Sequence, residues 1–227
     1  MANVNRVVFD IETLALPFDS FDAKQQEYLL KFARTEEERN DALLKMSLTP
    51  LTAQILAVAM LNPDSRQGKV FYQGTGQERS MTDDGLVELV PGTERDVLEG
   101  FWKTIAHYGQ FITFNGRGFD CPFLMLRSAL LGIRAGRNLM GYRFSSMDHC
   151  DLLEQLSFYG AFRKFNLDFY CRSFGIKSPK TELSGLDMGP LYQAGRYREI
   201  AEYCLGDVRA TAELFQRWQS LLAFEKQ

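Results

Sequence analysis

The sequence lacks the features that would place the chain in a membrane or among disulfide-stabilised secreted proteins. No run of about 18 apolar residues occurs, so no transmembrane helix is expected. The first residues, MANVNRVVFDIET, carry no charged segment followed by an apolar run, and they predict a strand rather than a signal peptide. The four cysteines form no CxxC pair, which predicts neither a zinc site nor a disulfide framework. We therefore expect a cytoplasmic protein without membrane contact.

Strong basic charge is also absent, since the net charge is −3 over 227 residues. The charge is nevertheless uneven. Residues 116–180 contain ten Lys and Arg against five Asp and Glu, so this window is net +5 and the rest of the chain is −8. Such a window could hold a phosphate backbone locally. Composition alone, however, favours an ordinary solvated surface.

Hydrophobic patterning predicts one α/β domain over residues 1–227. Apolar segments rich in β-branched residues predict strands at 4–11, 54–61, 69–74 and 110–114. Amphipathic segments predict helices at 94–108, 119–132 and 196–222, with shorter ones at 150–158 and 166–175. Residues 19–47 are charged and favour helix, which predicts a pair of helices inserted after the first strand. Polar residues with Gly and Pro predict mostly loop at 75–93.

Two carboxylates, Asp10 and Glu12, stand two residues apart at the end of the first predicted strand. Alternate residues of a strand share a face, so both side chains point to the same side. Two like charges beside an apolar core are unfavourable unless something neutralises them, and a divalent cation does so directly. An ordinary strand end with two solvated acids explains this pair equally well when the pair is taken alone.

Two further carboxylates lie in later segments. Asp120, in FNGRGFDCPFL, falls near the start of a predicted helix, where acidic residues are common because they complement the helix dipole. Asp207 follows Tyr203 by four residues in YCLGD, which puts both on one face of the last helix. A tyrosine hydroxyl one turn from a metal-bound carboxylate could hold an attacking water. Taken singly, each segment is better explained by a helix start or a surface charge.

Taken in order, FDIET, FNGRGFDCPFL and YCLGD resemble the three exonuclease motifs of the DEDD superfamily. The tyrosine four residues before the last aspartate marks the DEDDy branch, because the histidine branch would carry His where this chain has Glu202. The strongest resemblance is to stand-alone 3′-5′ exonucleases related to the proofreading domains of family B DNA polymerases. It extends from Val7 to Trp218 and includes the linking segments DHCDLL and KTELSGLDMGPLY.

The resemblance implies an RNase H-like fold with a mixed β-sheet of about five strands flanked by α-helices. It implies that two Mg²⁺ or Mn²⁺ ions are bound by four acids, Asp10, Glu12, Asp120 and Asp207, while Tyr203 orients the nucleophilic water. Two ions about 3.5–4 Å apart can stabilise the attacking and leaving oxygens of a phosphodiester. We therefore expect 3′-5′ hydrolysis of single-stranded DNA that releases nucleoside 5′-monophosphates.

The same resemblance suggests which side chains contact the substrate. Thr13 and Leu14 would flank the terminal nucleotide, with Leu14 beside the last base. Asn115 and Phe119 would contact the strand, although Phe119 fits the core equally well. Lys180 would contact a phosphate, with a solvated lysine as the alternative. A single strand suits such a site, because the terminal nucleotide must separate from any partner strand to reach the metal ions.

Other functions stay open from the sequence. DNA and RNA are not separable, since no identifiable residue reads the 2′-hydroxyl group, so a 3′-5′ exoribonuclease is an alternative. An RNase H-type endonuclease is disfavoured by the tyrosine motif. A catalytically inactive nucleic-acid-binding scaffold is disfavoured because all four acids and the tyrosine are present. The sequence specifies no protein partner and leaves the role of the insertion open, with coverage of the active-site mouth as one hypothesis.

Overall fold

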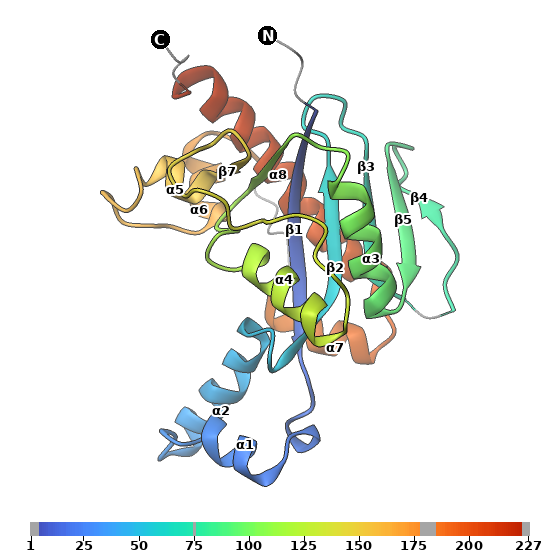
Figure 1. Ribbon diagram of the computed structural model, residues 1–227, viewed down its shortest axis with the longest axis vertical. Coiled ribbons are helices and arrows are strands. Elements are labelled where there is room, and N and C mark those ends of the chain that lie inside the picture. Colours follow the sequence, from blue (N-terminus) through green and yellow to red (C-terminus); the bar gives the residue numbers. More distant parts are fainter. Residues whose placement is uncertain (1–4, 75, 178–184, 224–227) are drawn as a thin grey trace.

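The computed structural model describes residues 5–74, 76–177 and 185–223, and it contains one mixed β-sheet (Figure 1). The strands are β1 (Arg6–Ala15), β2 (Ala53–Leu61), β3 (Gly68–Gln73), β4 (Ser80–Met81), β5 (Val87–Gly92), β6 (Gln110–Thr113) and β7 (His149–Asp151). Their order across the sheet is β4-β5-β3-β2-β1-β6-β7. β1 pairs with β2 antiparallel and with β6 parallel. The sheet therefore carries seven strands, and the predicted mixed α/β fold is confirmed.

Three strands depart from the sequence-based expectation. Residues 75–93 were expected to be mostly loop, but they contain β4 and β5. Buried and less buried side chains do alternate along the first half of β5, where Val87 and Leu89 are buried on either side of Glu88. Pro91 and Gly92 in its second half obscure this pattern in the sequence. β7 occupies the start of a segment expected to be helical, and at three residues it is too short to show a period of two.

Helices cover both faces of the sheet. They are α1 (Ala23–Leu29), α2 (Glu36–Lys45), α3 (Glu94–Ile105), α4 (Asp120–Leu130), α5 (Leu152–Leu156), α6 (Leu167–Ser173), α7 (Met188–Gln193) and α8 (Tyr197–Leu221). α3 and α4 pack on the face lined by Val7 and Phe9, and α8 packs on the face lined by Val8. Successive residues of β1 thus enter separate cores, as strand geometry requires.

The long helix α8 forms over the predicted residues because its apolar positions recur at helical spacing. Ile200, Cys204, Val208 and Phe215 are all buried against the sheet, while charged residues such as Glu202 are exposed on the opposite side of the helix. α3 likewise begins at its predicted first residue, Glu94, and the side chain of Thr93 caps it by accepting a hydrogen bond from the backbone N–H of Asp96. No helix in the described part of the chain is long and apolar enough to cross a membrane.

The insertion after β1 contains the two expected helices, α1 and α2. Each begins with a capping box, formed by Asp22 with Gln25 and by Thr35 with Glu38. Neither helix contains a buried residue, so local capping rather than core packing defines where they begin. Figure 1 shows both helices extending beyond the end of the sheet at which β1 finishes.

Candidate active site

Unequal strand lengths expose the carboxyl end of β1. β6 pairs with Arg6–Val8 and ends at Thr113, whereas β1 continues to Ala15. Asp10 and Glu12 therefore lie on β1 beyond the end of its parallel neighbour. The carboxyl ends of parallel strands are the usual place for ligands in α/β sheets, because loops there leave a crevice.

A β-bulge lies beside these two acids. The register between β1 and β2 shifts between Glu12 and Thr13, which leaves Leu56 as an extra residue on β2. Leu56 and Ala57 consequently enter the same core, although neighbouring strand residues normally face opposite sides. Bulges bend a strand and redirect side chains, and they occur often next to active sites. Here the bulge follows directly after Glu12, which is itself buried.

Asp120 reaches the same place from α4. Its Oδ1 accepts a hydrogen bond from the backbone N–H of Ile11, at 3.1 Å, across a separation of 109 residues. Ile11 stands between Asp10 and Glu12, so this bond brings the third acid against the pair. The carboxyl groups of Asp10 and Asp120 are close enough that each acts on the pKa of the other. The structure thus brings together three of the acids that the sequence singled out.

The loop that leads into Asp120 is fixed by Asp151, at the end of β7. The Asp151 carboxylate accepts hydrogen bonds from the backbone N–H groups of Asn115, at 3.0 Å, and Arg117, at 2.9 Å. It also accepts from the N–H of Leu153 and so caps α5. Asp151 is buried, and these hydrogen bonds position the loop.

α8 completes the cluster from the other side. The thiol of Cys204 donates a hydrogen bond to the backbone carbonyl of Asp10, at 3.4 Å, which fixes this turn of the helix against β1. Tyr203 precedes Cys204, and Asp207 follows Tyr203 by about one helical turn. The sequence analysis missed Cys204, although its place inside YCLGD was a signal. Its Sγ lies within 4.8 Å of carboxylate oxygens of Asp10 and Glu12.

The cluster is electrostatically strained without a cation. Burial raises the pKa of Asp10 and of Glu12 well above the usual carboxyl range, and the neighbouring acids Asp120 and Asp207 raise both further. Every group that acts on these two pKa values raises them. Burial also raises the pKa of Asp120 to about 7, opposed by its backbone hydrogen bonds. This oxygen-rich set of acids fits a hard divalent cation such as Mg²⁺ or Mn²⁺.

Two neighbouring groups keep their protons in this environment. Burial raises the pKa of Tyr203, and the charges of Asp207 and Glu12 raise it further. Burial and the charges of Asp10 and Glu12 likewise raise the pKa of the Cys204 thiol well above its ordinary value. Both groups are therefore hydrogen-bond donors at neutral pH, and Cys204 is a poor thiolate ligand.

The predicted substrate-contacting residues lie around the cluster at different distances from the surface. The Thr13 hydroxyl donates to the carbonyl of Ser47, at 2.8 Å, and so ties β1 to the end of the insertion. Leu14 is half-buried where α7 passes β1. Asn115 adopts a left-handed backbone with φ of 63°. Phe119 packs against Phe123 and the core under α4. Lys180 lies outside the described residues.

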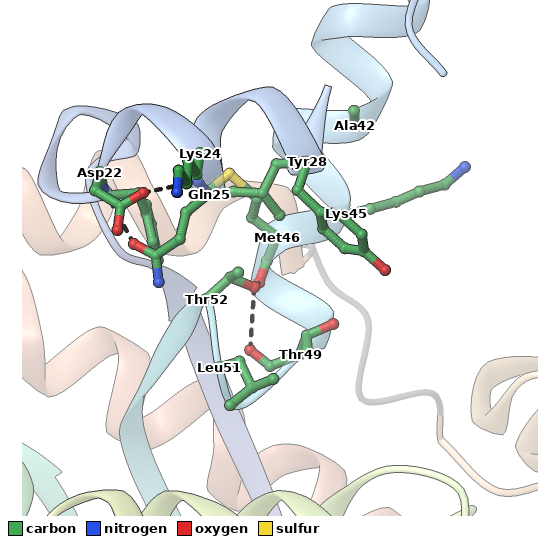
Figure 2. Close-up of a pocket in the computed structure, with 12 residues that line it drawn as sticks. Asp22, Lys24, Gln25, Tyr28, Ala42, Lys45, Met46, Thr49, Leu51 and Thr52 are labelled. Atoms are coloured by element: carbon green, nitrogen blue, oxygen red, sulfur yellow. Dashed lines mark hydrogen bonds between the residues drawn. The ribbon is translucent and has the colours of Figure 1, made fainter. Parts of the chain in front are cut away.

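A cavity of about 630 Å³ lies within the insertion and away from the acids. Figure 2 shows Tyr28, Met46 and Leu51 among the side chains around it. None of the four acids lines this cavity, and most of its polar atoms already bond within the insertion, as Thr52 does with the carbonyl of Met46 at 2.6 Å. Its lining carries none of the acids needed for metal-dependent chemistry.

Comparisons with known proteins bear on the family and the fold of the chain. The sequence profile of a family described as "Predicted 3'-5' exonuclease related to the exonuclease domain of PolB" matches residues 53–224. The match covers most of the chain and begins after the strand that carries Asp10 and Glu12. The DNA polymerase epsilon catalytic subunits A of Aspergillus fumigatus and Emericella nidulans are each 30% identical to this chain over 141 residues. The aligned region covers 55% of this chain and 6% of each subunit.

A solved structure shows the same fold. The family B DNA polymerase of the hyperthermophilic archaeon Pyrobaculum calidifontis matches with a TM-score of 0.61 and 18% sequence identity. The matched region covers 95% of this chain and 24% of the polymerase. The fold is therefore RNase H-like and similar to the exonuclease part of a family B polymerase. Since the family profile spans residues 53–224, the chain belongs to the family of predicted 3′-5′ exonucleases related to the exonuclease domain of PolB.

Proposed function

We propose that the chain is a divalent-metal-dependent 3′-5′ exonuclease that acts on single-stranded DNA. The observation that carries this proposal is the meeting of Asp10, Glu12 and Asp120 at the open end of β1, with Tyr203 and Asp207 on the adjacent helix. We also propose that the whole chain, 1–227, works as one exonuclease domain that carries the insertion at 19–47.

The four acids, Asp10, Glu12, Asp120 and Asp207, would hold two Mg²⁺ or Mn²⁺ ions. When bound, the ions would lower the pKa of a water molecule and stabilise charge on the departing 3′-oxygen. Tyr203, which keeps its proton, would hold that water in line with the terminal phosphorus through its hydroxyl. The bond from Ile11 to Asp120 keeps the acids in place before substrate arrives, so little reorganisation is needed during the reaction. The product would be a nucleoside 5′-monophosphate.

Labelled oligonucleotides test this proposal directly. A 5′-labelled single strand should give a ladder of shortened products with Mg²⁺ or Mn²⁺, and a 3′-labelled strand should release its label as a mononucleotide at once. Asp10→Ala should abolish both. No wild-type cleavage, or a ladder that survives in Asp10→Ala, would contradict the proposal. Separate reactions with a DNA and an RNA oligonucleotide of the same sequence test which sugar the enzyme prefers. Faster degradation of the RNA would favour the exoribonuclease.

A further inference from the structure

A second cavity, of about 440 Å³, lies beside the loop that leads into Asp120. Asn115, Arg117 and Gly118 of that loop line it together with Arg143 and Lys164, and the lining also includes two carboxylates, Asp151 and Glu154. Both carboxylates already have partners, because Asp151 accepts backbone hydrogen bonds and Glu154 pairs with Arg117 and Arg143. Aromatic residues adjoin two of these lining residues in the chain: Tyr142 and Phe144 stand on either side of Arg143, and Phe165 follows Lys164. We call this cavity and its flanking rings the aromatic groove; the rings are Tyr142, Phe144, Phe158, Tyr159, Phe162, Phe165 and Phe169.

Most rings of the aromatic groove are exposed, while Tyr159 and Phe165 are half-buried. The exposed fractions are 75% for Tyr142, 59% for Phe144 and 67% for Phe162. Phe144 contacts Tyr142 and Tyr159, with ring centroids 5.8 and 4.9 Å apart, so these rings form one continuous surface. Contiguous exposed apolar surface of this kind marks an interaction site, because folding alone would bury it.

The backbone presents part of this surface at an energetic cost. Phe158 and Tyr159 are consecutive non-glycine residues in the left-handed region, with φ of 49° and 57°. Such residues cost of order 1–3 kcal/mol each and persist only where the surroundings impose them. Here the turn is imposed by hydrogen bonds from the N–H of Tyr159 to the carbonyl of Glu154, at 2.7 Å, and from the N–H of Phe162 to the carbonyl of Ser157, at 3.1 Å. The strained turn fixes Phe158 in an exposed position.

Positive charge alternates with these rings. Arg163 lies over the ring of Phe165, at 5.0 Å from its centroid, and Phe165 stacks on Phe169. Within the described part of the chain, neither Arg163 nor Lys164 lies within ion-pair distance of a carboxylate, although most other arginines of the molecule do. Stacking rings interleaved with available cations suit a ligand that offers both flat bases and phosphates.

We propose that the aromatic groove binds the single strand behind the terminal nucleotide, with bases on Phe144 and the neighbouring rings and phosphates on Arg163 and Lys164. This inference rests on the proposed function, because Asn115 and Gly118 join the groove to Asp120 along one loop. A protein partner is the weaker fit, since the cations divide the rings rather than border one apolar patch. Binding of this kind is independent of base sequence.

The test compares a long and a minimal substrate. The long one is an oligothymidylate of about twenty nucleotides; the minimal one is the p-nitrophenyl ester of thymidine 5′-monophosphate, which reaches only the cluster. Phe144→Ala and Lys164→Ala probe the groove. Phe32→Ala and Lys103→Ala are matched controls, because Phe32 is 82% exposed on the insertion and the Lys103 side chain is 80% exposed on α3.

Each groove variant should raise KM for the oligothymidylate about tenfold with little change in kcat, because one stacked base or one phosphate contact is lost. The minimal ester should be hydrolysed equally by all variants. Lys164→Ala should also reduce the slope of the logarithm of the binding constant against the logarithm of the salt concentration by about one. Both controls should behave as wild type.

Equal affinity of groove variants and wild type for the oligothymidylate would overturn the inference, and so would an equal loss on both substrates. If the wild type cleaves neither substrate, the proposed function is wrong. Strand binding by the aromatic groove is then tested by affinity measurements alone. Fluorescence anisotropy of a labelled oligothymidylate then decides: weaker binding by Phe144→Ala than by Phe32→Ala supports the groove, and equal binding rejects it.

Discussion

Asp10 carries the highest density of unfavourable charge in the candidate site. Three neighbouring carboxylates and burial all raise its pKa, and none of the described groups that act on this pKa lowers it. An acid in such a place destabilises the metal-free fold once it ionises, and a bound cation would offset that cost. The residue is therefore a direct test of whether the cluster is built for a metal.

We expect Asp10→Asn to abolish hydrolysis while raising the Tm of the metal-free protein near pH 8. The substitution removes one like charge but keeps the shape of the side chain. Each kcal/mol of relieved repulsion should raise Tm by about 2–4 °C in a chain of this size. Differential scanning calorimetry in a chelator measures the effect. A lower Tm than wild type would show that the carboxylate stabilises the fold by itself.

Tyr203 tests the chemistry rather than the stability of the site. Its hydroxyl stays protonated because burial and the surrounding acids raise its pKa, so it can donate to a water held beside the acids. Tyr203→Phe should reduce kcat by about 10²-fold, the lower end of the range for a positioned proton-transfer or donor group, with little change in KM. Steady-state kinetics on a labelled strand measures both. An unchanged kcat would remove Tyr203 from the mechanism.

At the scale of elements, three segments meet only because separate hydrogen bonds hold their ends. The N–H of Ile11 on β1 donates a hydrogen bond to Asp120 of α4. The thiol of Cys204 on α8 donates a hydrogen bond to the carbonyl of Asp10 on β1. The loop before α4 is held in turn by Asp151. The geometry of the acid cluster thus depends on contacts from Ile11, Cys204 and Asp151, which are not among the four acids.

Asp151→Asn should therefore loosen the loop that leads into α4. The amide keeps one acceptor oxygen and loses the second, so one buried backbone N–H is left without a partner. The expected loss in the free energy of unfolding is about 1–3 kcal/mol, with a fall in kcat because Asp120 shifts. Urea unfolding and single-strand kinetics measure the two effects. Asp148→Asn, an exposed neighbour, is the control and should change stability by less than about 0.5 kcal/mol.

Elements with strong periodicity could be predicted from the sequence. The β-branched run of β1, the capped α3 and the regularly spaced apolar residues of α8 carry local signals. β5 and β7 could not, because one contains a proline at its outer end and the other is only three residues long. The meeting of Asp120 with Asp10 has no local signal either, since more than one hundred residues separate them, and only the resemblance between motifs predicted it.

At the scale of the whole molecule, pH and metal should act together on stability. The folded-state pKa values of Asp10, Glu12 and Asp120 lie above those of an unfolded chain, so the folded state binds protons more tightly. The stability contributed by these protonated acids is complete below about pH 4 and is lost as pH rises, through about 7 for Asp120. A bound cation removes this loss because it favours the ionised acids.

We therefore expect Mg²⁺ or Mn²⁺ to raise Tm more at pH 8 than at pH 5. Thermal unfolding at both pH values, with and without metal, measures the difference, and Asp10→Asn should lose most of the metal effect at pH 8. An equal or larger effect of metal at pH 5 would contradict the assignment of the cluster as a cation site. Other acids of the chain contribute equally to both proteins and cancel in this comparison.

The two edge strands of the sheet, β4 and β7, affect whether copies of the chain aggregate at high concentration. Unpaired strand edges recruit further strands and so lead to aggregation. Here the outermost strands are short: β4 has two residues and β7 has three. β4 covers only Glu88 and Leu89 of β5, and beyond them stands Pro91, which has no N–H to offer an incoming strand. The two edges of the sheet thus offer little backbone for pairing with another copy of the chain. Lengthening β4 or replacing Pro91 should lower the protein concentration at which the chain aggregates.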